Sequence, residues 1–267
     1  GFDAHSELSS SPPKETTVNR FPYGWRYVMK PSPTGAECYD QIPLTAEDLR
    51  HPQLEDQVPQ RNAHFQAILD LASTLKTYYA EDPNIGVFGD LIMDWGIPEL
   101  DRAAPDIAII PHLKHKQADR GIFKVVEEGT RPCLVIEVTS PGQPGDDTTK
   151  VTLYARAGIP EYFLIKPHLE REVPYYKLSG YRLESGVYQP LVPDAQGRLL
   201  SQTLQFWLGV EDDGRLVRVT EAQTGQRWLT PTEMKVARQQ EQAARLAAEA
   251  RTQALAAKLR ALGIDPD

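Results

Sequence analysis

Glu137 has the type and surroundings of a residue that does chemistry. It lies inside the apolar run 133–138, whose strand-forming residues predict a central strand buried on both faces. An ionised carboxylate buried in such a strand costs several kcal/mol unless it is paired or binds a metal. The most economical interpretation is a metal site whose other members come from elsewhere in the chain.

Asp106 offers a second carboxylate for such a site. It follows Pro105 at the start of a predicted strand over 105–110. Two adjacent strands can present carboxylates to one Mg²⁺, an ion that takes one or two carboxylates together with phosphate oxygens and water. The sequence therefore predicts Asp106 and Glu137 as ligands of Mg²⁺ or Mn²⁺. Taken alone, Asp106 is equally well interpreted as a turn residue after a proline.

Lys150 offers a positive charge for the same place. Thr139 occupies the position two residues after Glu137, where a catalytic lysine would share the strand face. Lys150, Leu153, Tyr154 and Ala157 fall at i, i+3, i+4 and i+7 of a helix that Asp146 or Asp147 would cap and Gly158 would end. That face packs toward the sheet, so we expect the ammonium group to reach Glu137. The alternative is a lysine that snorkels off the edge of an apolar stripe.

The remaining periodicities predict the elements that position these residues. A helix is expected over 62–79, with Asn62 as a candidate N-cap, and a strand over 85–93. A strand over 161–165 follows a helical crossover and is expected to run parallel to the Glu137 strand. A hairpin over 173–188 is expected to turn at Ser179–Gly180, and shorter apolar runs follow at 203–210 and 216–219.

The two ends of the chain differ from this middle part. Residues 1–20 are polar and predict disorder. The aromatic cluster 21–27 is interpreted as a packing anchor, and the Pro-rich stretch after it as an extended arm with one short helix over 45–49 capped by Thr45. A long Ala-rich helix begins at the Thr230 cap and stops at Gly263, which favours a dimerising coiled coil or a helix lying along the body. We expect a domain over 21–225 and a helical tail over 230–263.

Composition limits the function classes. The 267 residues are 40% hydrophobic and 25% charged, as in a globular protein with one substantial core. A formal net charge of −8 excludes a protein that only coats nucleic acid, so any such contact needs a local patch. The loop 112–120 and Lys124 are expected to supply it, in preference to a metal pair of His112 and His115. Only two cysteines occur, which favours a reducing cytoplasm, and no run approaches the roughly 18 apolar residues of a membrane span.

Several of these motifs together resemble one family. P-D-I-A-I-I at 105–110, L-V-I-E-V-T-S-P at 134–141, the set Asp146, Lys150 and Tyr154, and A-G-I-P-E-Y-F-L-I at 157–165 resemble the Uma-two-type family of "putative restriction endonucleases" in the PD-(D/E)XK nuclease superfamily. The resemblance spans roughly 20–220, and His64, the turn at Asp94 and the coiled tail also match. It implies an α/β restriction-endonuclease-like core, a mixed sheet flanked by helices.

The resemblance also implies a reaction. Mg²⁺ held by Asp106 and Glu137 would support hydrolysis of DNA phosphodiester bonds, and Lys150 would stand in for the displaced lysine of the E-x-K pattern. Asp90 is a further candidate acidic ligand. Two alternatives stay open: an inactive nuclease-like scaffold or DNA-binding protein that forms a homodimer through its C-terminal helix, and a metal-dependent hydrolase of nucleotides.

Overall fold

The structure, a computed structural model, describes residues 25–30, 38–45, 47–48, 53, 56–57, 62–139, 148–168 and 175–265. The chain folds as two compact units. The first contains a small antiparallel sheet of order β2-β1-β3, formed by β1 (Trp25–Lys30), β2 (Cys38–Pro43) and β3 (Asp56–Gln57). A paired hairpin therefore stands where the sequence predicted an extended arm. The prediction of disorder for residues 1–20 lies outside the described residues.

The predicted Thr45 cap is present in this unit. The Thr45 hydroxyl accepts the Asp48 backbone N–H at 3.2 Å, and the Asp48 carboxylate accepts the Thr45 N–H at 2.7 Å. These reciprocal bonds satisfy two backbone donors at the start of a turn.

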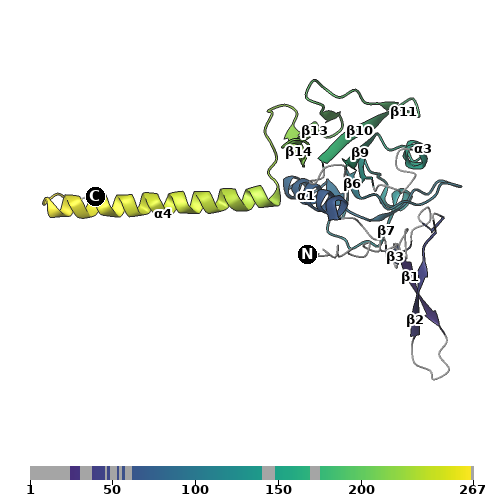
Figure 1. The fold of residues 1–267 in the computed structure, drawn as a ribbon, viewed down its shortest axis with the longest axis horizontal. Helices are drawn as coiled ribbons and strands as arrows, with labels where there is room; N and C mark the ends of the chain where they lie inside the picture. Colours follow the sequence, from purple (N-terminus) through teal and green to yellow (C-terminus); the bar gives the residue numbers. More distant parts are fainter. Residues whose placement is uncertain are drawn as a thin grey trace, which may run out of the picture. The chain divides into compact units, whose positions relative to one another are not determined.

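The second unit is built on a six-stranded mixed sheet of order β11-β10-β9-β8-β6-β4 (Figure 1). Its strands are β4 (Gly86–Phe88), β6 (Ile107–Ile110), β8 (Leu134–Val138), β9 (Glu161–His168), β10 (Tyr175–Glu184) and β11 (Val187–Pro190). β8 and β9 run parallel, as the helical crossover between them predicts, and the other neighbours are antiparallel. The predicted fold class, α/β with a mixed sheet flanked by helices, is confirmed.

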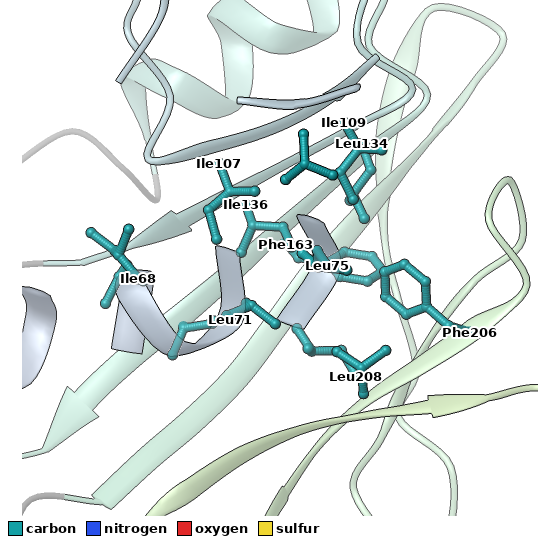
Figure 2. Close-up of a cluster of buried hydrophobic side chains, with 14 of the residues drawn as sticks. Ile68, Leu71, Leu75, Ile107, Ile109, Leu134, Ile136, Phe163, Phe206 and Leu208 are labelled. Atoms are coloured by element: carbon teal, nitrogen blue, oxygen red, sulfur yellow. The ribbon is translucent and has the colours of Figure 1, made fainter. Parts of the chain in front are cut away.

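One face of this sheet is covered by α1 (Asn62–Tyr78) and by a three-stranded sheet of β12 (Leu199–Ser201), β13 (Phe206–Glu211) and β14 (Leu216–Glu221). Figure 2 shows the core between them, where Leu71 and Leu75 of α1 meet Ile107, Ile136, Phe163 and Phe206. Because side chains alternate along β8, Leu134 and Ile136 enter this core while Val135 enters a second core on the other face.

The second core lies under α3 (Thr149–Arg156) and a parallel pair of short strands, β5 (Ile92–Asp94) and β7 (Ile122–Lys124), the latter followed by α2 (Val125–Glu128). Gly158 has a φ of +73° directly after the C-cap Ala157, which confirms it as the residue that ends α3. Thr148 occupies the N-cap position of α3 and makes no side-chain capping bond, so the predicted cap at Asp146 or Asp147 was wrong. Asp146 and Asp147 themselves lie outside the described residues. β7 and α2 were not predicted, because 121–128 shows no clear period.

Two element predictions were wrong for physical reasons. β10 runs unbroken through Ser179–Gly180. A Cβ on Gly180 would stand 2.9 Å from Phe163 Cδ1, so the glycine makes room for the Phe163 ring. The hairpin turns instead at Ser185–Gly186, whose φ values of +50° and +81° suit a tight two-residue turn between β10 and β11. The predicted strand over 85–93 is two strands, β4 and β5, separated by a bend.

The C-terminal helix is α4 (Pro231–Ala261), and Thr230 caps it as predicted. The structure adds a reciprocal bond pattern between Thr230 and Glu233. No residue of α4 is buried. Its first turn is held by Arg218 of β14, whose side chain is 2% exposed and lies 2.6 Å from Glu233 Oε1. Among the described residues, no helix is long and apolar enough to cross a membrane.

Candidate active site

The register of β6 against β8 places two carboxylates opposite each other. Ile107 pairs with Ile136 and Ala108 with Val135. Continuing this antiparallel pairing by one residue sets Asp106 across from Glu137, although 31 positions separate them in the chain. The Asp106 N–H donates to Glu137 Oε2 over a long 3.4 Å, and the Val138 N–H donates to Asp106 Oδ2 at 2.7 Å. Backbone geometry thus fixes both side chains.

Both carboxylates are buried on the α3 side of the sheet. Asp106 is 9% exposed and Glu137 is 1% exposed. Like charges directly opposite each other on a sheet repel, so this arrangement needs positive charge nearby to be stable.

Lys150 brings positive charge from the first turn of α3. Its Nζ lies 3.0 Å from Glu137 Oε1, and its side chain is 32% exposed. The stem therefore lies against the core while the ammonium group adjoins both Glu137 and the surface. The structure brings Asp106, Glu137 and Lys150 together as expected, although their catalytic roles stay a prediction.

Thr139, at the third position of the displaced E-x-K pattern, continues the sheet. Its backbone N–H donates to Ile165 O at 2.9 Å, extending the β8–β9 pairing. The positive charge at the site therefore comes from Lys150 of α3 and not from the third position of the E-x-K pattern.

Tyr154, one turn after Lys150, is a site residue for which sequence reasoning predicted no role. Its hydroxyl donates to Glu137 Oε1 at 2.5 Å, and its side chain is fully buried. Its ring stands edge-on to Trp95 and Tyr162, with centroids 6.0 and 4.9 Å away. The available signal was the i, i+4 spacing from Lys150, which places both side chains on one helix face.

The donor set fits a hard divalent cation. Within the parts of the chain that the structure describes, no group of three or more His, Cys, Asp or Glu side chains is placed to hold a metal. Mg²⁺ does not require one, because it commonly binds one or two carboxylates and completes its shell with water and substrate phosphate. Asp106 and Glu137 supply that pair of oxygen donors.

Asp90 does not lie in a strand as the sequence predicted. It occupies the bend between β4 and β5 with a φ of +52°, and it is an exposed residue. Its backbone N–H donates to Pro105 O at 3.0 Å, which ties the bend to the residue before Asp106. Its role as a further ligand stays a prediction.

The other residues of the resemblance have local roles or lie outside what is described. The Asp94 carboxylate accepts the Gly96 N–H and pairs with Arg102, contacts that hold the pKa of Asp94 below its ordinary value. It thereby shapes the turn that carries Trp95. The side chain of His64 is not among the described ones.

Two basic residues of the loop 112–120, Lys116 and Arg120, use their charges inside the fold. Lys116 Nζ donates to the carbonyl oxygens of Tyr79 and Asp82 at 2.5 and 2.7 Å, just after the end of α1. Arg120 pairs with Glu128 at 2.7 Å. The loop also leaves the end of β6 opposite to Asp106, six residues further on, which is about 20 Å of extended chain. These contacts do not support the predicted phosphate-binding role of Lys116 and Arg120.

A third buried carboxylate, Glu161 in β9, was also not predicted. It is 1% exposed and accepts the Ser201 hydroxyl at 2.6 Å, the Gln202 N–H at 2.8 Å and an ion pair from Arg182 at 3.3 Å. It lies opposite Leu134, at the other end of β8 from Glu137. Its partners join the central sheet to β12, so its role is structural.

Comparison with known protein families identifies the class of protein. The model of the Uma2 family, described as "Putative restriction endonuclease", matches residues 37–213, which is more than half of the chain. The chain therefore belongs to that family, the one its motifs resemble. No curated protein matches.

Among solved structures, one similar chain is described as "a putative nuclease belonging to DUF820" from Anabaena variabilis ATCC 29413. It is 19% identical, with a TM-score of 0.37 over 53% of this chain and 74% of that one.

Proposed function

We propose that this protein is a metal-dependent endonuclease that hydrolyses DNA phosphodiester bonds. The observation that carries the proposal is the placement of two buried carboxylates side by side, with the Lys150 ammonium 3.0 Å from one of them. Membership of the family described as "Putative restriction endonuclease" supports the substrate class. The cytoplasmic location inferred from cysteine usage stays a prediction.

In this proposal Asp106 and Glu137 would hold Mg²⁺ or Mn²⁺. Such an ion, when bound, polarises a phosphate and lowers the pKa of a water molecule. The burial of both carboxylates limits their motion and excludes bulk water, which strengthens their interaction with any cation. Lys150, partly exposed, would contact the scissile phosphate, orienting the attacking water or stabilising the charge that develops in the transition state.

The test is calorimetric titration of Mn²⁺ into the parent protein and into Glu137→Ala. We expect binding in the parent and none in the variant, together with a loss of plasmid cleavage of at least about a thousandfold, because the variant keeps a single carboxylate. Asp106→Ala should behave in the same way.

Glu161→Gln is the matched control, because Glu161 is as buried as Glu137 but lies at the other end of the strand pair. It should lower the melting temperature and leave Mn²⁺ binding intact. If neither the parent alone nor the parent with an uncleavable DNA duplex binds Mn²⁺, the scaffold alternative replaces this proposal.

We also propose that the protein forms a homodimer through α4. Val236, Ala243, Ala250 and Ala257 recur every seven residues, and Gln240, Ala247 and Ala254 recur in the same way between them. This spacing of 3 and 4 is that of a coiled-coil seam, and small seam residues allow two helices to approach closely. The residues of this seam are exposed, which supports a second copy as its occupant.

A further inference from the structure

We propose that Tyr154 is a positioning residue that orients Glu137 for metal binding. Its hydroxyl and the Lys150 ammonium both reach Glu137 Oε1, at 2.5 and 3.0 Å. The other oxygen, Oε2, then turns toward Asp106, from which it receives the long 3.4 Å contact. This inference rests on the proposed metal site.

Holding one oxygen matters because a glutamate side chain has three rotatable bonds. Freezing such a side chain costs conformational entropy. If hydrogen bonds to Oε1 fix the Glu137 side chain before a cation binds Oε2, that entropy is not lost when the cation binds. Groups that orient metal-binding carboxylates through their second oxygen typically change metal affinity by about 10- to 100-fold when removed.

The position of the Tyr154 hydroxyl is fixed by the core. The ring is fully buried between Trp95 and Tyr162, in edge-to-face contacts with both. Trp95 is held in turn by its indole N–H, which donates to Asp101 O at 2.9 Å. The hydroxyl therefore has little freedom to follow Glu137 if that carboxylate moves.

A buried tyrosine also needs a hydrogen-bond partner for purely structural reasons. Tyr188 provides the comparison that separates the two roles. It is 8% exposed, belongs to the same aromatic cluster, and stacks on Tyr162 with centroids 6.2 Å apart. Its hydroxyl donates to the backbone oxygen Ile159 O at 2.9 Å and not to a carboxylate. The two tyrosines match in burial and differ in the acceptor.

The experiment compares Tyr154→Phe with Tyr188→Phe by Mn²⁺ calorimetry and by melting temperature. Each variant loses one buried hydroxyl, so both should melt somewhat below the parent. Tyr154→Phe should bind Mn²⁺ about 10- to 100-fold more weakly, and Tyr188→Phe should bind it as the parent does. An affinity of Tyr154→Phe within twofold of the parent, or an equal loss in both variants, overturns the positioning role.

Cleavage kinetics supply a second readout. For Tyr154→Phe, the Mn²⁺ concentration that gives half-maximal cleavage should rise, while kcat at saturating Mn²⁺ and KM for DNA stay near the parent values. A fall in kcat that added Mn²⁺ does not restore would also overturn the inference. If the parent binds Mn²⁺ and Glu137→Ala does not, a null result for Tyr154→Phe refutes this inference alone. If the parent binds no Mn²⁺, either alone or with an uncleavable DNA duplex, both proposals fail together.

Discussion

At the residue scale, Glu137 Oε1 is the point where the site is assembled. An ammonium group and a phenolic hydroxyl from one helix converge on this single carboxylate oxygen in the neighbouring strand. Bonds to a charged acceptor are roughly twice as strong as neutral ones, so the two contacts fasten α3 to β8. Tyr154 is buried and Lys150 is partly exposed, so their proposed roles can be tested separately. Tyr154 would orient Glu137, and Lys150 would contact the scissile phosphate.

Lys150→Ala tests that separation. We expect cleavage to fall by about 10²- to 10³-fold, the effect of removing one donor to developing transition-state charge. Mn²⁺ affinity should stay equal or become tighter, because a positive charge next to a metal ligand is removed while Tyr154 still holds Oε1. Cleavage assays and calorimetry measure the two quantities on the same preparation.

Lys177→Ala, an exposed lysine of β10, is the control and should match the parent in both measurements. A large loss of Mn²⁺ affinity in Lys150→Ala would mean that the lysine serves only to place Glu137.

The grouping of Asp106, Glu137 and Lys150 in one place was predicted from the sequence pattern. A lone carboxylate in an apolar strand and a lysine on the apolar face of a helix are local signals, and they were sufficient for Glu137 and Lys150. Asp106 was predicted only in combination with them, because alone it is equally well interpreted as a turn residue. Glu161 carries no such signal, because a glutamate at a strand start is ordinary. The i, i+4 spacing of Tyr154 from Lys150 places both residues on one helix face but does not indicate the acceptor of the Tyr154 hydroxyl. The roles of Tyr154 and Glu161 depend on partners 17 and 40 positions away, which only the folded chain reveals.

At the element scale, the beginning of α4 is fixed by a buried arginine. Arg218 of β14 pairs through both terminal nitrogens with the Glu233 carboxylate, at 2.8 and 2.6 Å, and its Nε lies 3.1 Å from Glu211. The hydrogen bonds from Arg218 lower the pKa of Glu233 from its ordinary 4.5 to about 2. A helix without a buried residue is thereby joined to the β12–β14 sheet at a defined point.

This pair predicts a pH dependence of stability. A carboxylate with a depressed pKa stabilises the folded state fully above its unfolded value, and the contribution is lost as the pH falls from about 4.5 through about 2. Glu233→Gln should therefore melt below the parent at pH 7, and the difference should shrink as the pH approaches 2. Glu241→Gln, an exposed glutamate of the same helix, should show no such convergence. A difference that is independent of pH would contradict the role of the ion pair.

Elements with a periodic sequence pattern were predicted correctly. The turn at Gly180 was not, because a glycine can either form a turn or make room for a neighbouring side chain. The 3.6-residue period gave α1 and α4, the latter with its Thr230 cap, and the crossover rule gave the parallel pair of β8 and β9. Gly180 was interpreted as a turn residue, whereas it makes room for Phe163. Sequence does not distinguish a glycine that permits a positive φ from one that admits a neighbouring ring.

At the scale of the whole molecule, the acidic chain carries a basic helix. Between residues 231 and 261 there are six basic and three acidic side chains, although the formal net charge of the protein is −8. The seam of Val236, Ala243, Ala250 and Ala257 has Lys258 and Arg251 beside it. Pairing of two copies would bury the alanines and leave these longer side chains at the rim, where their stems can cover apolar surface.

A matched pair of substitutions in α4 tests the dimer. Ala250→Glu places a charge within the seam, and Ala248→Glu places the same charge on another face of the helix at the same helix-propensity cost. Light scattering after size-exclusion chromatography should show a dimer for the parent and for Ala248→Glu, and a monomer for Ala250→Glu and for a chain ending at residue 230. The truncated chain lacks Glu233, so it should melt lower, yet it keeps Asp106, Glu137 and Lys150 and should still bind Mn²⁺.

The outcomes of this test show which surface forms the dimer and whether DNA cleavage depends on it. A dimer that persists without α4 would assign the interface to another surface. Dissociation by Ala248→Glu in place of Ala250→Glu would move the seam to the face that carries Leu255 and Leu262. If the monomeric variants cleave DNA at the parental rate, each copy holds a complete site, as the origin of all three candidate residues in one chain leads us to expect. If they bind Mn²⁺ but cut only one strand of a duplex, the dimer would serve to place two such sites on opposite strands.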